Sequence, residues 1–140
     1  MAELVGVAHL VLRVTDWRRS ATWYQETLGF ERRQGKGFSG FSHPGSNFVL
    51  LFRPADEAGV SSGEPTQRLE HIALHVPSVE ALEQWGEDLR GKGIDTEIEH
   101  GGVGSSITLH DPDGLEVELF APRLGGVLDP GVPAAEVAAS

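Results

Sequence analysis

One short pattern occurs twice in this 140-residue chain, and it constrains the fold more than any other feature. The first copy is His9-Leu-Val-Leu-Arg-Val14 and the second is His71-Ile-Ala-Leu-His-Val76. Each copy is a short run dominated by apolar, β-forming residues, which predicts a strand with a histidine at its start. Side chains alternate along a strand, so each histidine shares a face with the residues two and four positions later. We interpret the two histidines as facing one another across a shared site.

Each copy precedes a predicted helix and three short strands. Residues 17–28 and 79–92 carry apolar side chains at helical spacing, and Gly29 and Gly93 follow at the expected C-terminal caps. Strands are expected at residues 30–34, 37–42 and 47–53, and again, after a strand at 69–76 and the second helix, at 94–99, 105–110 and 115–120. The predicted order is therefore βαβββ twice, which is an α+β fold.

The two halves align on one another with a rising shift. A shift of 62 residues superposes His9 on His71, and a shift of 68 superposes the last hairpins, so that Leu50 matches Glu118. Loop insertions between duplicated modules produce such a rise, and a single repetition indicates paired modules. We predict one domain over residues 1–122, with module one at 5–54, a surface linker at 54–68, module two at 69–122 and a flexible tail at 123–140.

Composition narrows the class of protein. Hydrophobic residues make up 39% of the chain, which is enough for a packed core. The net charge of -10 argues against binding to nucleic acid or to an anionic membrane, because both need basic patches. The chain has no cysteine, no apolar run long enough for a transmembrane helix and no visible secretory signal. These features predict a cytoplasmic protein.

Three motifs resemble the vicinal oxygen chelate superfamily, which includes glyoxalase I, fosfomycin- and bleomycin-resistance proteins and extradiol dioxygenases. They are the repeated His-x-x-Leu-x-Val strand, the helix end Tyr24-x-x-x-Leu-Gly-Phe30, and Asp111-Pro-Asp-Gly-Leu-Glu-Val-Glu-Leu-Phe120. The resemblance spans residues 5–122. It implies two βαβββ modules whose curled mixed sheets form a cleft, with the helices outside and a divalent metal at its base. It also implies a homodimer.

The resemblance implies a metal site made of His9, His71 and Glu118. The superfamily draws its ligands from the first and last strands of each module, and glyoxalase I enzymes usually have a carboxylate or amide where this chain has Leu50. Leucine cannot ligate a metal, so three ligands remain. Two imidazoles and one carboxylate suit Fe, Mn, Ni or Zn and leave positions open for a substrate.

Other residues near these ligands are candidates for substrate binding, each with a simpler alternative. In glyoxalase I an arginine at the spacing of Arg13 contacts an anionic substrate group, but a strand-end arginine can also reach into water. His75 is a general base or a solvated strand end, and Glu116 is a base, a support for a ligand or a surface residue. Phe48, Leu50 and Phe52 share one face, which either lines the cleft or belongs to the core.

Two main functions follow from the resemblance, and neither identifies catalytic residues beyond the metal site. The first is a metal-dependent enzyme that acts on a small substrate with vicinal oxygens, by isomerase, lyase or ring-cleaving dioxygenase chemistry. The second is a non-catalytic protein of the bleomycin-resistance type that binds a drug or natural product on its aromatic face. A third interpretation is a duplicated scaffold with vestigial histidines. His43, His100 and His110 fall in or beside turns and are expected to be solvated.

Overall fold

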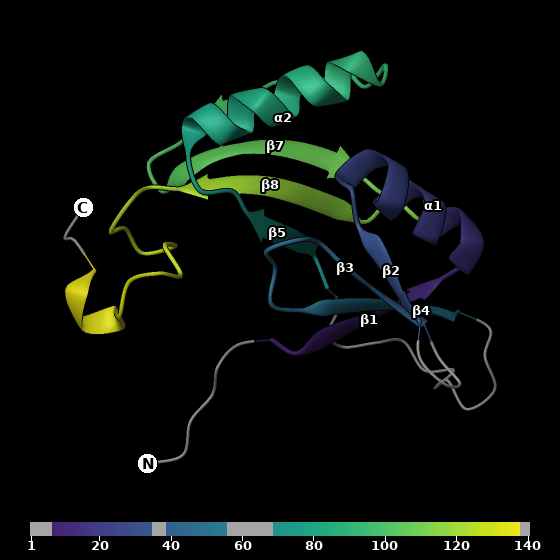
Figure 1. Cartoon of the computed structure of the whole chain (residues 1–140). Helices are drawn as coiled ribbons and strands as arrows, with labels where there is room; N and C mark the ends of the chain where they lie inside the picture. Colours follow the sequence, from purple (N-terminus) through teal and green to yellow (C-terminus); the bar gives the residue numbers. More distant parts are fainter. Residues whose placement is uncertain (1–6, 35–38, 56–68, 138–140) are drawn as a thin grey trace, which may run out of the picture. The chain divides into compact units, whose positions relative to one another are not determined.

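The computed structural model describes residues 7–34, 39–55 and 69–137. Its strands and helices follow the predicted order, βαβββ twice (Figure 1). The first module comprises β1 (His9–Val14), α1 (Trp17–Leu28), β2 (Glu31–Gln34), β3 (Ser39–Ser42) and β4 (Val49–Pro54). The second comprises β5 (His71–His75), α2 (Val79–Gly91), β6 (Glu99–His100), β7 (Gly104–His110) and β8 (Glu116–Pro122), and a short 3-10 helix, η1 (Ala134–Glu136), follows. The predicted α+β fold of two βαβββ modules is confirmed.

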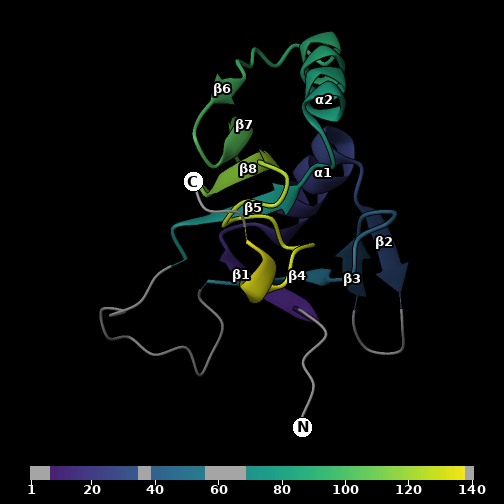
Figure 2. The same ribbon diagram turned by 90° about the vertical axis from the view of Figure 1, so that its left-hand side faces the viewer.

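The chain divides into two compact units, each with its own four-stranded mixed sheet. Unit 1 is residues 1–67 with Asp111–Asp113, and unit 2 is residues 68–110 with 114–140. The strand order is β1-β4-β3-β2 in unit 1 and β5-β8-β7-β6 in unit 2. The first and last strands of each module pair in parallel, and the other pairs are antiparallel. Figure 2 shows β2 beside β3 in unit 1 and β7 beside β8 in unit 2. A cleft shared by the two sheets stays a prediction.

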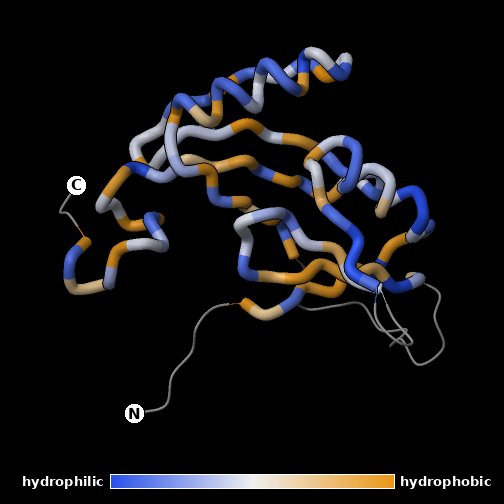
Figure 3. Tube along the Cα trace, in the orientation of Figure 1, coloured by the Kyte–Doolittle hydropathy of each residue, from blue (hydrophilic) through white to orange (hydrophobic). Residues whose placement is uncertain are grey.

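In unit 2, one face of the sheet packs under α2. Leu82 and Leu89 of α2 are fully buried, as are Ile107 of β7 and Val117 of β8. Figure 1 shows α2 lying along β7 and β8, and Figure 3 shows hydrophobic stretches in both strands. Because side chains alternate along a strand, the residues next to these apolar ones point away from α2. The second face of this sheet, which we call its open face, carries the partly exposed side chains of His71, Glu116 and Glu118.

In unit 1, α1 covers one face of its sheet through an aromatic cluster. The ring of Tyr24 lies 5.3 Å from that of Phe52 and 5.7 Å from that of Phe30. Asp16 caps the start of α1, where its carboxylate accepts from the backbone N–H groups of residues 18 and 19. Gly29 ends the helix at φ 83°, a left-handed conformation that glycine adopts without a steric cost. The predicted boundaries of α1 are confirmed.

The segment Asp111–Asp113 follows β7 in the sequence but belongs to unit 1. Asp111 is buried and accepts a hydrogen bond of 2.9 Å from the hydroxyl of Tyr24. Asp113 accepts from the backbone N–H and the hydroxyl of Thr15, at 3.2 and 2.8 Å, and its carboxylate lies 3.8 Å from the guanidinium of Arg19. Two carboxylates thus fix this segment to the first two turns of α1 and the residue before its cap.

One predicted strand is wrong over most of its length. Residues 94–98 form no strand, and only Glu99 and His100 pair with β7. The alternation of Ile94, Thr96 and Ile98 is typical of a strand, but these residues run beside α2. A side chain at Gly86 of α2 would lie 3.8 Å from the Thr96 hydroxyl oxygen. The apolar side chains here serve packing against a helix, which the period alone does not distinguish from a strand. The linker residues 56–68 lie outside the described residues.

Candidate metal centre

The parallel pairing of β5 with β8 brings a histidine and two glutamates together on the open face of unit 2. His71 pairs with Glu116, and Ala73 pairs with Glu118. Paired residues of neighbouring strands point to the same side of a sheet, and Glu116 and Glu118 are two positions apart, so all three side chains share one face. One possible ligand atom from each lies within 4.8 Å of the others. We call His71, Glu116 and Glu118 the candidate metal centre.

The distances within the centre are close to those that a shared ion requires. His71 Nδ1 lies 3.6 Å from Glu116 Oε2, and His71 Nε2 lies 4.0 Å from Glu118 Oε2. Ligand atoms on one ion sit about 2.0–2.2 Å from it and therefore about 3 Å from one another. The side chains are 37%, 38% and 20% exposed, so small rotations can close the gap.

The charge of the centre favours a cation. Glu70, whose carboxylate lies 3.1 Å from His71 Nδ1, adds a third acidic group. Among the described residues, His71 is the basic side chain that pairs with Glu116 and Glu118. Carboxylates this close repel one another, and a divalent ion would neutralise that repulsion. One imidazole and two carboxylates also form a donor set that Fe²⁺, Mn²⁺, Zn²⁺ and Ni²⁺ accept. The residues present therefore fit a divalent metal.

The remaining predicted ligand and the predicted arginine lie in unit 1. His9 begins β1 and is exposed, and Arg13 lies on the same strand and face. The Arg13 guanidinium donates to the carbonyl of Pro54 at 3.2 Å. Val49 and Leu51 of β4 stand beside His9 and Val11 on this face. The association of His9 with His71 and Glu118 stays a prediction.

The predicted equivalence of Leu50 with Glu118 is wrong by one residue. Glu118 pairs with Ala73, two places after His71, and the matching position in unit 1 pairs with Val11, two places after His9. That residue is Leu51, so the shift between the last strands is 67, not 68. A slip of one residue moves a side chain to the opposite face of a sheet. The position that matches Glu118 still has no ligating side chain, because Leu51, like Leu50, is a leucine.

The same register corrects the prediction for the aromatic face. Leu50 is 1% exposed, and the Phe52 ring contacts Tyr24 of α1. Phe48 lies just before β4, with its ring 6.3 Å from that of Phe30. The three side chains share one face as predicted, but that face packs under α1 and belongs to the core. They therefore lie on the face opposite that of His9 and Leu51, and their role in substrate binding stays a prediction.

Two further residues were weighed from the sequence alone. Glu116, for which the sequence leaves a base, a support for a ligand or a surface residue open, belongs to the candidate metal centre. Its position two residues before Glu118 was the signal, because it placed both carboxylates on one face. His75 lies on the open face, paired with Phe120, at the end of β5 away from the centre. Its role as a substrate-binding residue stays a prediction.

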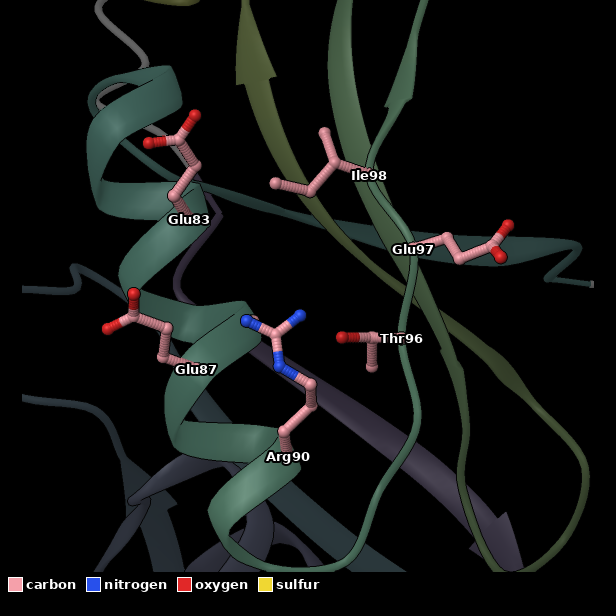
Figure 4. A pocket seen from close by; sticks show the side chains of 7 residues that line it. Glu83, Glu87, Arg90, Thr96, Glu97 and Ile98 are labelled. Carbon is pink, nitrogen blue, oxygen red and sulfur yellow. The ribbon is translucent and has the colours of Figure 1, made fainter.

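A separate hollow lies on the other side of unit 2, between α2 and residues 94–98 (Figure 4). It has a volume of about 530 Å³ and is open to solvent. Figure 4 shows the Arg90 guanidinium near Thr96, Ile98 pointing towards the helix, and Glu97 pointing away. Because α2 covers the face opposite the candidate metal centre, this hollow is not part of that site.

No helix in the described ranges is long and apolar enough to cross a membrane.

Comparison with known families agrees with this architecture. Residues 6–119 match the model of the Glyoxalase/Bleomycin resistance protein/Dioxygenase superfamily. The match covers more than half of the chain, and the chain belongs to this superfamily. A search of curated proteins found no match.

Solved structures give the same fold. A glyoxalase/bleomycin resistance protein/dioxygenase from Nocardioides is 25% identical, with a TM-score of 0.64 over 96% of this chain and 93% of that one. A lactoylglutathione lyase from Agrobacterium tumefaciens is 15% identical, with a TM-score of 0.67 over 86% and 96%. An antibiotic-binding protein from Streptomyces sp. CB03234 is 19% identical, with a TM-score of 0.60 over 88% and 100%. The last two show the fold alone.

Proposed function

We propose that this protein is a metal-dependent enzyme that acts on a small substrate with two adjacent oxygens. The observation that carries this proposal is the candidate metal centre on the open face of unit 2, where three potential ligand atoms lie within 4.8 Å. Superfamily membership supports isomerase, lyase or ring-cleaving dioxygenase chemistry, because its name includes glyoxalases and dioxygenases. The substrate proposed has vicinal oxygens because two adjacent oxygens can chelate one ion.

The chain's own residues have separable roles in this proposal. Glu116 and Glu118 would hold a divalent ion through one oxygen each, and His71 would hold it through Nε2. Glu70 would then accept from Nδ1–H of His71, which fixes the tautomer and the orientation of the ring. The ion would act as a Lewis acid that stabilises negative charge on the substrate. A substrate would bind on the side of the ion away from the strands.

The alternative, a non-catalytic drug-binding protein, loses the feature that motivated it. On the face of Phe48, Leu50 and Phe52, Leu50 is buried and the Phe52 ring packs against Tyr24 of α1, so little of this face is exposed to a ligand. The similarity to an antibiotic-binding protein is a likeness of fold. This alternative is therefore an outcome of the test below rather than a second proposal.

The test is the metal content of untagged protein, measured by mass spectrometry after reconstitution. We expect about one divalent ion per chain in the wild type and its loss in His71→Ala, Glu116→Ala and Glu118→Ala, because each variant removes one ligand atom of the centre. Glu87→Gln, on α2, is the matched control and should keep the metal. The variant His9→Ala tests the remaining one of the three ligands that the resemblance implied, and loss of metal in it would add His9 to the site.

Two results would count against the proposal. A wild type that binds no divalent ion at micromolar concentration would redirect the search to ligands bound without metal, such as planar natural products. Metal that persists in both His71→Ala and Glu118→Ala would show that the ion sits elsewhere. The identity of a bound metal would separate the chemistries, since iron favours dioxygenase activity and zinc or nickel favours isomerase activity.

A further inference from the structure

The open face of unit 2 extends beyond the candidate metal centre onto β7. This strand pairs antiparallel with β8, so that His110 stands opposite Glu116 and Thr108 opposite Glu118. Ile107 and Leu109 are buried on the side of α2, at 0% and 5% exposure. Because side chains alternate, Thr108 and His110 point to the other face, and both are exposed. The open face therefore includes a second histidine beside the centre.

His71, Glu116 and His110 form one row across three adjacent strands. Glu116 is in the middle, paired with His71 on one side and with His110 on the other. Directly paired residues have Cβ atoms about 4.5–5.5 Å apart, so the two histidines stand roughly 10 Å apart on either side of Glu116. The side chains of His110 and His71 are of equal length, so their rings reach the same height above the sheet. The His110 ring thus borders the space above Glu116.

The His110 ring is positioned to contact a substrate rather than to hold the ion. Its nitrogens are not among the three ligand atoms that lie within 4.8 Å of one another. No hydrogen bond or ion pair engages the ring within the described part of the chain. The next residue, Asp111, is buried and accepts a hydrogen bond of 2.9 Å from the hydroxyl of Tyr24. The imidazole of His110 therefore stands beside the centre on β7, and no described residue bonds to it.

We propose that His110 is a further substrate-binding residue, which donates a ring N–H to an oxygen of the substrate at the candidate metal centre. This inference rests on the proposed function, because it needs a substrate held there. An imidazole N–H favours an oxygen that carries negative charge, and such hydrogen bonds are the stronger ones. The substrate class is accordingly a compound with vicinal oxygens of which at least one is anionic when bound, such as a catecholate, a hydroxamate or an enediolate.

The experiment uses the full-length chain loaded with Mn²⁺ and titrated with 4-nitrocatechol, a chelating probe whose ionisation is visible by absorbance. His110→Phe keeps a planar ring and removes the donor, whereas His110→Gln keeps an N–H at similar reach. His100→Gln is the control, because His100 pairs with the buried Ser105 and belongs to the opposite face. Metal content is measured for each variant in parallel.

We expect His110→Phe to bind one Mn²⁺ per chain but to bind 4-nitrocatechol about tenfold more weakly, the effect of one lost hydrogen bond to a charged group. The affinity of His110→Gln should fall by less than threefold, and that of His100→Gln should not change. Equal affinity of His110→Phe and the wild type would overturn the proposal, as would loss of Mn²⁺ from His110→Phe, which would make His110 a ligand. A wild type without Mn²⁺ would overturn the proposed function itself and this inference with it.

Discussion

The hydroxyl of Tyr24 donates a hydrogen bond of 2.9 Å to Oδ2 of Asp111, and both residues are buried within unit 1. Burial, followed by the negative charge of Asp111, raises the pKa of Tyr24 well above its ordinary value. Tyr24 is the only tyrosine in the sequence. Its ionisation can therefore be followed in the intact protein without interference from a second phenol.

The first prediction concerns this titration. Tyr24 should stay protonated in the folded protein at pH 11, with no phenolate absorbance near 295 nm, and should ionise when the chain is unfolded in urea at the same pH. Because the folded-state pKa is raised, the associated stability is complete below the unfolded pKa of about 10 and is lost as the pH rises above it. Tyr24→Phe should lower the free energy of unfolding at pH 8 by about 1–2 kcal/mol. A normal phenolate titration in the folded state would contradict the hydrogen bond.

The second prediction tests the register of β4. Leu50→Glu places a carboxylate in the core under α1 and should lower the free energy of unfolding by roughly 4 kcal/mol or prevent folding. Leu51→Glu places the same group on the face of the unit 1 sheet that points away from α1 and should cost less than about 1 kcal/mol. Urea denaturation of the two variants measures the difference. If Leu51→Glu were the more damaging change, the alignment with a shift of 68 would be correct after all.

The third prediction concerns Gly104, at the start of β7. Its φ is +156°, and a Cβ there would lie 2.5 Å from the carbonyl oxygen of Ala121 and 2.6 Å from the Phe120 ring. Gly104→Ala should therefore cost roughly 2–4 kcal/mol of stability. Gly114→Ala is the matched control, because Gly114 has φ +85° but open space around it, and it should cost about 1 kcal/mol. Thermal unfolding that ranks the two variants equally would contradict the close contact at Gly104.

The fourth prediction concerns the segment after β8. The Asp129 carboxylate accepts hydrogen bonds from the backbone N–H groups of Gly125 and Gly131, at 2.9 and 3.0 Å, and these lower its pKa. A lowered pKa means that the bonds are complete above the unfolded pKa of about 3.9 and weaken as the pH falls through the folded value. Asp129→Ala should speed amide exchange of Gly125 and Gly131 in NMR experiments at neutral pH. Asp95→Ala is the control, and unchanged exchange in Asp129→Ala would show that the carboxylate does not order this segment.

The sequence predicts the order of strands and helices because both modules repeat the same series of local signals. A histidine-led strand, a capped helix and a glycine recur, and local rules of capping and periodicity are enough to place β1, α1, β5 and α2. The prediction of His71 and Glu118 as neighbours on one face depended on the resemblance, and the pairing of β5 with β8 brings them together. Residues 94–98 were misjudged because alternation fits both a strand and a chain that packs against a helix.

The register in which the strands pair could not be predicted from the sequence. Val49-Leu-Leu-Phe52 and Val117-Glu-Leu-Phe120 align by letter at a shift of 68, whereas the pairing of β4 with β1 sets a shift of 67. Cross-strand partners depend on hydrogen bonds between distant segments, and a slip of one residue leaves local propensities unchanged while it exchanges the faces. The position of His110 beside Glu116 cannot be predicted from the sequence for the same reason, because it follows from the pairing of β7 with β8.

Because Asp111–Asp113 is attached to α1, the first half of this duplicated chain depends on residues from the second half. A polypeptide cut in the linker after residue 67 would separate Tyr24 and Thr15 from the carboxylates that accept their hydrogen bonds. The first half alone would bury a phenol without an acceptor, at a cost of about 1–3 kcal/mol. The duplicated halves are therefore no longer interchangeable building blocks: the first requires three residues that only the second encodes.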